Sequence, residues 1–305
     1  MKLIHLFLLL RRRSGEILSR FVVVGIVCLF CTGFAVAAEK KVVNDQPISV
    51  FVSIVPQAYF VKRVGGDRVR VEVLVRPGAS PATYAPTPKQ MARLARAMVF
   101  FRIGVPFENA LLPKIRRTMP HLRIVDTGRE IRRVPLNKGT GEKTRELDPH
   151  IWLDPLLVKK QAAVIMETLV AMDPAGKAVY TENYNKFAED LNTLDKEIRT
   201  MLAPVAGKTV FVYHPAYGYF CRAYGLYQKA VETGGKNPTS KHLGRLIKEA
   251  KEEGVRAIFV QPQFSRKKAR VIARAIGGRV IVFDPLAYDY ITNLYQVAKR
   301  LAQVL

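Results

Sequence analysis

Cysteine, histidine and tryptophan are scarce in this 305-residue chain, which has 3 Cys, 5 His and 1 Trp. So few cysteines exclude a small scaffold stapled by disulfides. Acidic residues are also outnumbered, because 25 Asp and Glu stand against 49 Lys and Arg, a formal net charge of +24. Hydrophobic residues make up 49% of the chain, which excludes intrinsic disorder and a fibrous repeat and predicts about two folded domains.

Common enzyme motifs are missing from the sequence. It has no G-x-G-x-x-G after a strand, no P-loop, no G-x-S-x-G elbow and no H-E-x-x-H pair. Cys221 lies near no histidine in a known nucleophile pattern. Nothing in the sequence therefore resembles a common hydrolase or a nucleotide enzyme.

The first 37 residues have the composition of an export signal peptide. A basic region that includes Arg20 precedes the apolar run 21–34, and Ala35 and Ala37 supply the small residues before a cleavage site. The run is shorter than the roughly 20 residues that a membrane span needs. We predict cleavage near Ala37 and a periplasmic or extracytoplasmic protein, with a retained anchor as the alternative. A lipid anchor is not expected, because neither Cys28 nor Cys31 follows a small residue.

Cleavage would leave 44 basic and 24 acidic residues, a net charge of +20, and Cys221 as the only cysteine. No intramolecular disulfide is then possible. The basic residues are dispersed along helix-like segments, so we expect a solvated basic surface and no nucleic-acid partner.

Hydrophobic patterning predicts an α/β fold. Short β-branched runs alternate with amphipathic segments, which is typical of parallel βαβ units. The expected strands are 48–55, 69–75, 97–103, 122–125, 209–213, 257–261 and 279–283. The predicted divisions are a signal peptide (1–37), a short linker (38–47), an N-terminal α/β lobe (48–155), a helical connection (156–203) and a C-terminal α/β lobe (204–305).

The middle of the chain is predicted to be helical. One helix fits 156–172, and a longer one fits 177–202, where an apolar stripe from Tyr180 to Met201 recurs every three or four residues. At 1.5 Å per residue this helix would be about 39 Å long. It could connect two domains, or it could be the core helix of one.

Several polar residues directly follow predicted strands. His214 follows the strand 209–213, Asp284 follows 279–283, and the proline-rich segment 77–88 follows 69–75. Ligands of open parallel sheets bind at the carboxyl ends of strands. His150 lies in a compact segment, 148–155, with the single tryptophan. Two imidazoles and a carboxylate suit a cation such as zinc, although a strand-end role for His214 and a helix-cap role for Asp284 are the alternatives.

The chain resembles the cluster A-I metal-binding substrate-binding proteins of ABC transporters, which serve zinc and manganese uptake. The resemblance covers the chain from residue 48 to the C-terminus. It depends on several marker segments in order: ISVFVSIVPQAYFVKRVGGD (48–67), TPKQM (87–91), HIWLDP (150–155), ENYNKFAEDLNTLDKEI (182–198), HPAYGYF (214–220) and DPLAYDY (284–290).

The resemblance implies two α/β lobes with mostly parallel sheets, joined by one long rigid helix, with a metal in the cleft between them. It implies His150, His214 and Asp284 as ligands. A fourth ligand, usually histidine, is replaced by Ala82, which has no donor atom. We therefore expect weaker metal binding than in a four-ligand relative. The vacancy could be filled by Tyr84, Tyr59 or Gln261, or the pocket could accept a metal chelate or small anion.

The resemblance also implies the function. We expect a monomeric binding protein, and not an enzyme, that captures zinc, or manganese as the second choice, and delivers it to a membrane permease driven by a cytoplasmic ATPase. Two other classes stay open at this point. A zinc hydrolase would need a general base, for which Glu232 and Asp289 are candidates. A surface adhesion protein would need no metal.

Overall fold

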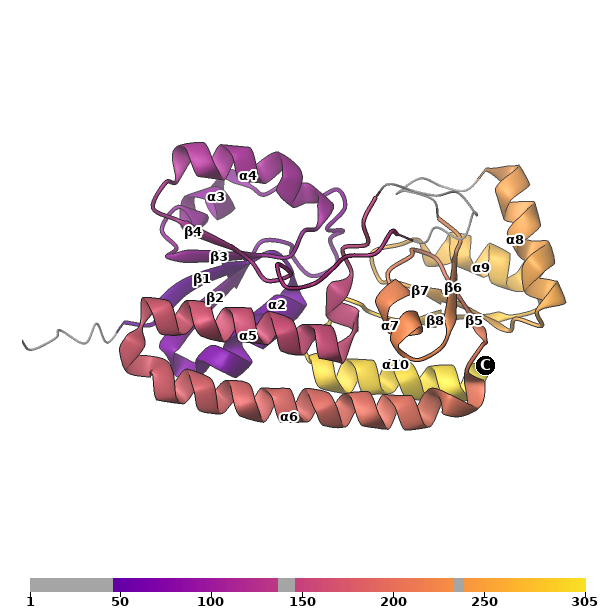
Figure 1. Cartoon of the computed structure of the whole chain (residues 1–305). Coiled ribbons are helices and arrows are strands. Elements are labelled where there is room, and N and C mark those ends of the chain that lie inside the picture. The colour runs from indigo at the N-terminus through magenta and orange to yellow at the C-terminus, as the bar shows by residue number, and fades with distance from the viewer. Residues whose placement is uncertain (1–45, 137–145, 233–238) are drawn as a thin grey trace, which may run out of the picture. The chain divides into compact units, whose positions relative to one another are not determined.

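Two four-stranded parallel sheets form the framework of the computed structural model, which describes residues 46–136, 146–232 and 239–305 (Figure 1). The described residues belong to one compact unit, Asp45–Leu305. The predicted signal peptide (1–37) and most of the predicted linker (38–47) lie outside them. Within the described ranges, no helix is both long and apolar enough to span a membrane.

The first sheet has the strand order β2-β1-β3-β4 and is parallel throughout. Its strands are β1 (Ile48–Val52), β2 (Val69–Val73), β3 (Val99–Arg102) and β4 (Arg123–Asp126). The connecting elements are α2 (Val55–Gly65), η1 (Gly66–Arg68), α3 (Pro88–Leu94) and α4 (Pro106–Thr118). The central strands β1 and β3 are largely buried, as expected for parallel strands covered by helices.

The second sheet repeats this topology with the order β6-β5-β7-β8, again all parallel. Its strands are β5 (Thr209–Val212), β6 (Tyr227–Ala230), β7 (Ala257–Val260) and β8 (Arg279–Val282). Its helices are α7 (Gly218–Ala223), α8 (Ser240–Glu252), α9 (Arg266–Ala275) and α10 (Tyr290–Val304). In both sheets the strand order reverses beside the first central strand, and such switch points create crevices at the carboxyl ends of strands.

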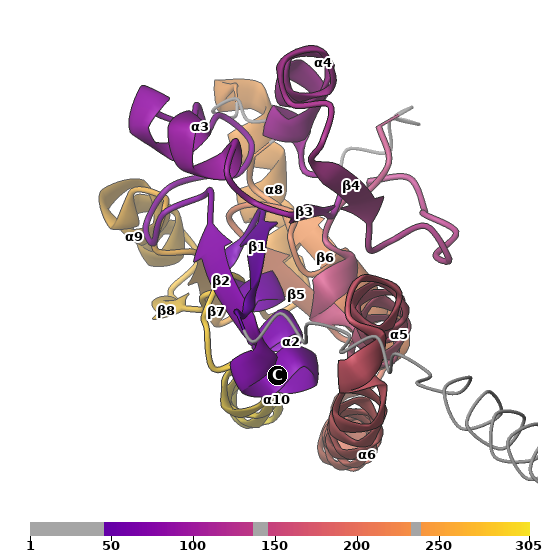
Figure 2. The ribbon, with the colours of Figure 1, turned by 90° about the vertical axis from the view of Figure 1, so that its left-hand side faces the viewer.

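A helical segment connects the two sheets. It consists of η2 (Ile151–Leu153), α5 (Pro155–Met172), η3 (Pro174–Gly176), α6 (Lys177–Leu202) and η4 (Ala203–Val205). The predicted long helix is confirmed with 26 residues and the expected bounds. Figures 1 and 2 show α6 beside α5 and α10, and it also contacts α2.

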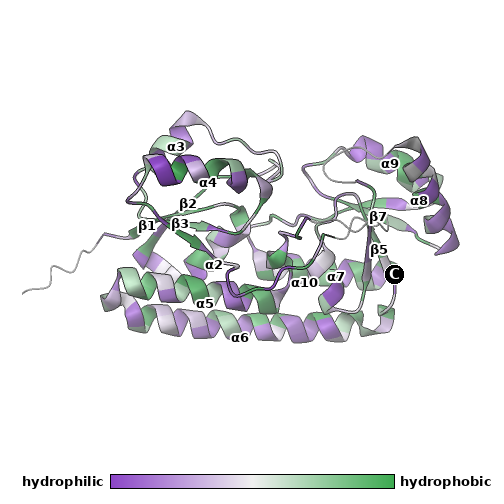
Figure 3. Cartoon of the chain, turned by 45° about the horizontal axis from the view of Figure 1, so that its top comes forward, coloured by the Kyte–Doolittle hydropathy of each residue, from purple (hydrophilic) through white to green (hydrophobic). Residues whose placement is uncertain are grey.

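The core runs through this connection without a break. Along α6, hydrophilic and hydrophobic residues alternate (Figure 3), and Phe187, Leu191 and Ile198 of the apolar stripe are fully buried. These side chains share one cluster of buried residues with Val50 of the first sheet and Phe259 of the second. The long helix is therefore both a connection and a core helix.

The expected strands are all present, most of them a few residues shorter than predicted. Strand β6 was not predicted. Its sequence, YQKA, shows no apolar run, because it is an edge strand of which Tyr227 is exposed while Gln228 and Ala230 are buried.

Candidate metal site

The imidazoles of His150 and His214 face each other across a cleft between the two sheets. His150 lies just before η2, and His214 follows β5. Their Nε2 atoms are 3.3 Å apart, and the rings meet edge to face with centroids 5.2 Å apart. Two residues separated by 64 positions in the chain are thus brought into direct contact.

A buried carboxylate holds the His150 ring. Asp148 Oδ1 accepts hydrogen bonds from the His150 backbone N–H at 2.9 Å and from the ring Nδ1 at 2.7 Å. With Nδ1 as donor, Nε2 keeps its lone pair and points it at the cleft. Burial lowers the pKa of His150, and the Asp148 carboxylate offsets this only in part. The neutral ring is therefore favoured, which is the form that binds metals.

His214 is held in a similar way. Its Nδ1 lies 3.2 Å from Glu232 Oε1, and Glu232 is buried two residues after β6. The Gln261 side chain accepts from the His214 backbone N–H at 3.3 Å and donates to its carbonyl at 2.9 Å. Phe264 stacks on the ring with an interplanar angle of 22°. The orientation of this imidazole is thus determined by three neighbours.

The cleft is a cavity of about 840 Å³. It is lined by segments that follow strands of both sheets, including Gly104 after β3, His214 after β5 and Gln261 after β7. Two ring nitrogens with inward lone pairs repel each other unless a cation or proton lies near both. With carboxylates behind both rings, this part of the cavity is suited to a divalent cation.

Asp284 lies beside this site but not in it. Its Oδ1 accepts from the backbone N–H of Leu286 at 2.9 Å, within a turn that precedes α10. The helix-cap role considered as an alternative belongs to Asp289 instead. Pro285 and Leu286 line the cavity, whereas Asp284 does not. Across the described residues, no three His, Cys, Asp or Glu side chains gather closely enough to hold a metal. The role of Asp284 as a ligand stays a prediction.

Ala82 lines the cavity together with Ser80 and Thr83. Of the three residues considered as replacement ligands, only Gln261 also lines it, and both of its amide atoms bind the His214 backbone. Tyr84 donates its hydroxyl to Gln90 at 2.9 Å. Tyr59 packs against Phe187 of α6.

Two supporting residues were not identified from the sequence. Asp148 stands two positions before His150, a spacing that could have suggested a ring partner. Glu232 was considered only as the base of a hydrolase, but it contacts the His214 ring instead. The second candidate base, Asp289, caps α10 by accepting from Thr292 N. No local pattern links Glu232 to His214, because strand pairing brings them together.

The family comparison, the related sequences and the solved structures all point to metal-binding proteins. A family model described as ZnuA, the periplasmic component A of a zinc-uptake complex, matches residues 50–304. The high-affinity zinc uptake system protein ZnuA of Bacillus subtilis (strain 168) is 28% identical over 265 residues, which cover 82% of this chain and 81% of that protein. The manganese-binding lipoprotein MntA of Halalkalibacterium halodurans (strain C-125) is 25% identical over 259 residues, 84% of each.

A solved structure of a zinc-bound ZnuA deletion mutant superposes on the chain with a TM-score of 0.80 and 37% identity. The superposition covers 85% of this chain and 98% of that one. The similarity therefore includes both sheets and the helical connection.

Proposed function

Because this chain belongs to the ZnuA family of periplasmic zinc-uptake components, we propose that it captures a divalent metal ion and delivers it to an ABC permease. The chain is a binding protein and not an enzyme, as its family membership establishes. Zinc is the first candidate metal, since imidazole nitrogen suits zinc better than it suits manganese. Manganese is the second.

The facing pair of imidazoles carries this proposal. Their Nε2 atoms are 3.3 Å apart, and each Nδ1 lies against a buried carboxylate, Asp148 or Glu232. Metal-binding histidines are commonly oriented by such partners, which settle the tautomer and raise the basicity of the ligand. With both Nδ1 atoms directed at these carboxylates, the two Nε2 atoms face each other and are the ring nitrogens left for a metal.

We propose Asp284 as the third ligand. Its Oδ1 is used by Leu286, but Oδ2 makes no hydrogen bond within the described residues. The Asp284 side chain would have to turn toward the histidines, since it is absent from the cavity lining. With Ala82 opposite, the protein would supply three donors, and one position would stay open for another group.

The family supplies the cellular setting. The family is periplasmic, and we propose that this chain reaches that compartment through a signal peptide, residues 1–37, cleaved near Ala37. We further propose that it acts as a monomer and releases its metal to a membrane permease coupled to a cytoplasmic ATPase.

The test is calorimetric titration of the purified, metal-free protein with zinc and with manganese. His150→Ala and His214→Ala should each weaken zinc binding by more than about tenfold. Replacing a residue that only supports a metal ligand already weakens metal binding by about 10- to 100-fold. His121→Ala is the matched control, because His121 is exposed and binds the Ala95 carbonyl away from the cavity. Unchanged affinity in both site variants would refute the assignment.

A further inference from the structure

Two arginines stand on the cavity wall at the carboxyl ends of the first sheet. Arg102 ends β3, and Arg133 follows β4. Of the described residues that line the cavity, these are the only cations. Polar but uncharged Thr83 and Asn109 lie on the same wall, as does Ala82. Glu146 and Glu232 also line the cavity, so the donors for an anion come from the arginines of this wall.

Two glycines leave the space that the Arg133 guanidinium occupies in the cavity wall. A Cβ atom added at Gly104 would come within 2.6 Å of the guanidinium, and one at Gly128 within 2.9 Å. Gly104 also has a φ of 90°, which side-chain-bearing residues rarely adopt. The Arg133 side chain is only 15% exposed, so its guanidinium is held in place before any ligand arrives.

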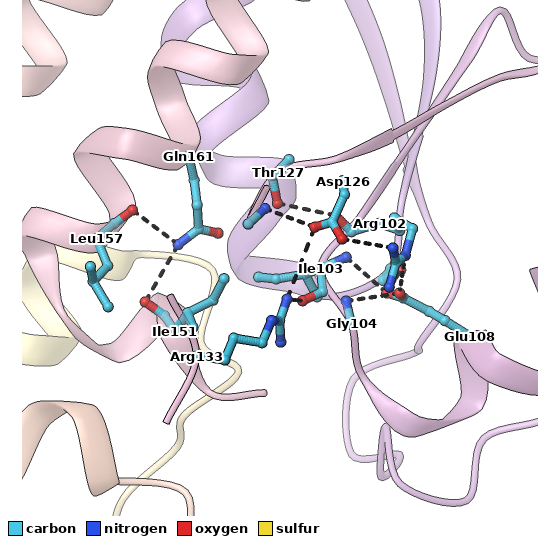
Figure 4. Close-up of polar contacts among 12 residues, drawn as sticks. Arg102, Ile103, Gly104, Glu108, Asp126, Thr127, Arg133, Ile151, Leu157 and Gln161 are labelled. Carbon is cyan, nitrogen blue, oxygen red and sulfur yellow. Dashed lines mark hydrogen bonds and ion pairs between the residues drawn. The ribbon is translucent and has the colours of Figure 1, made fainter. Parts of the chain in front are cut away.

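The two guanidinium groups differ in the N–H donors that they leave free for a ligand (Figure 4). Arg102 donates to Glu108 Oε2 at 3.1 Å and to Asp126 Oδ2 at 2.6 Å. Arg133 donates through Nη2 to the Ile103 carbonyl. Its Nε and Nη1 have no hydrogen bond within the described residues. Arg133 therefore keeps donors for a ligand, while Arg102 orders the carboxylates around it.

We propose that the cleft takes its metal as a chelate, in which a small polycarboxylate binds the metal beside His150 and His214 and places another carboxylate on Arg133. This rests on the proposed function. Guanidinium matches a carboxylate through paired N–H donors. The volume, about 840 Å³, lies in the range of small-molecule sites and is far larger than one ion needs. The anion would occupy the coordination position that Ala82 leaves without a donor.

The charges of this wall make the two ligands interdependent. Glu108, which is fully buried, pairs with Arg102, and Asp126 pairs with Arg102 at 2.6 Å and with Arg133 at 4.0 Å, so the two carboxylates offset the charge of the two arginines. A free carboxylate therefore gains little, and it binds well only when the metal adds positive charge. Binding of metal and anion should be cooperative, with a coupling of roughly 5- to 150-fold as is usual between linked sites.

The test is a zinc titration at buffered free zinc, with and without citrate as the probe. In the unmodified protein, citrate should raise zinc affinity at least about fivefold, whereas citrate alone should bind weakly. Arg133→Gln should keep zinc binding and lose the citrate effect. Arg129→Gln is the matched control, because Arg129 pairs with Glu130 and Glu167 outside the cavity, and it should keep the effect.

A second variant protects the test against misfolding. Asn109 is exposed on α4, so Asn109→Asp should fold normally and repel the anion, removing the citrate effect. Two results would overturn this inference and leave the proposed function standing. Citrate could fail to change the zinc affinity of the unmodified protein, or the citrate effect could survive in both Arg133→Gln and Asn109→Asp. Absent zinc binding, or binding insensitive to His150→Ala and His214→Ala, would instead overturn the proposed function.

Discussion

At the scale of single residues, the candidate site depends on pairs. His150 and His214 face each other, and each ring is oriented by a carboxylate, Asp148 or Glu232, that no ligand motif includes. The histidines follow from the sequence because they stand beside strands and in marker segments. Their partners do not, because a hydrogen bond to a ring nitrogen depends on the backbone path and on strand pairing.

Asp148→Asn tests this dependence. The amide can still accept from Nδ1, so the fold should survive, but the loss of charge should make Nε2 less basic and weaken zinc binding about 10- to 100-fold. Asp154→Ala is the control with the opposite pattern. Asp154 caps α5 by accepting from Leu156 N and Leu157 N, so this variant should lose about 1 kcal/mol of stability and keep its zinc affinity. Calorimetry and thermal melts measure both quantities; equal zinc affinity in the two variants would exclude the role of Asp148.

Ala82→His tests the missing ligand. Ala82 lines the cavity, so an imidazole there would add a fourth nitrogen donor, tighten zinc binding by about tenfold or more and displace the anion. The citrate effect should disappear in this variant. Thr83→His, at the next position on the same wall, controls for the mere presence of an added histidine. Unaltered zinc affinity would mean that position 82 does not face the metal.

At the scale of elements, the turn between α5 and α6 is fastened by one carboxylate. Asp173 Oδ2 accepts from Arg68 Nε and from the Tyr180 hydroxyl, each at 2.7 Å, and Asp173 Oδ1 accepts from Gly176 N at 3.3 Å. Since Arg68 belongs to η1, this contact fastens the helical connection to the first sheet. Hydrophobic periodicity predicted both helices, but it did not reveal that Asp173 binds Arg68.

The Asp173 contact should give stability a defined dependence on pH. Burial raises the pKa of Asp173, but the hydrogen bonds from Tyr180 and Arg68 outweigh it, so the pKa is lowered overall. The ionised group therefore stabilises the fold above the unfolded pKa of about 4, and this contribution is lost as pH falls through the folded pKa. Asp173→Asn should cost roughly 1 kcal/mol at pH 7 and almost nothing near pH 2.

Denaturant unfolding across this pH range measures the difference. Glu182→Gln serves as the control, because Glu182 pairs only with Lys186 on the exposed face of α6. Its effect should be marginal at every pH. If the difference in the free energy of unfolding between Asp173→Asn and the unmodified protein stays constant with pH, the linkage is contradicted.

At the scale of the whole described unit, one core joins the two sheets. Buried residues of α6, such as Leu191, belong to the same cluster as residues of both sheets. Trp152 adds a further link, since its Nε1 donates to the Pro285 carbonyl after β8 at 2.7 Å. A shared core favours movement of the sheets as one body and restricts hinge motion.

A shared core should also make unfolding cooperative. Fluorescence of the single tryptophan and far-UV circular dichroism should report one coincident transition in denaturant. Leu191→Ala should cost about 2–5 kcal/mol and shift both signals together, because Leu191 is fully buried in the cluster. Val179→Ala, at an exposed position of the same helix, should shift neither by much. Two separate transitions would show that the sheets fold independently.

The sequence by itself determined the α/β alternation, the bounds of α6 and the two histidines, because each depends on local periodicity or on residues adjacent in the chain. It did not reveal β6, whose edge position removes the apolar pattern. Only the tertiary structure decided that Asp284 binds the Leu286 backbone, that Glu232 supports His214 and that Arg133 lies between two glycines at the cavity wall. Those arrangements arise when distant strands pair and align their carboxyl ends, and no spacing along the chain records which side chains then meet.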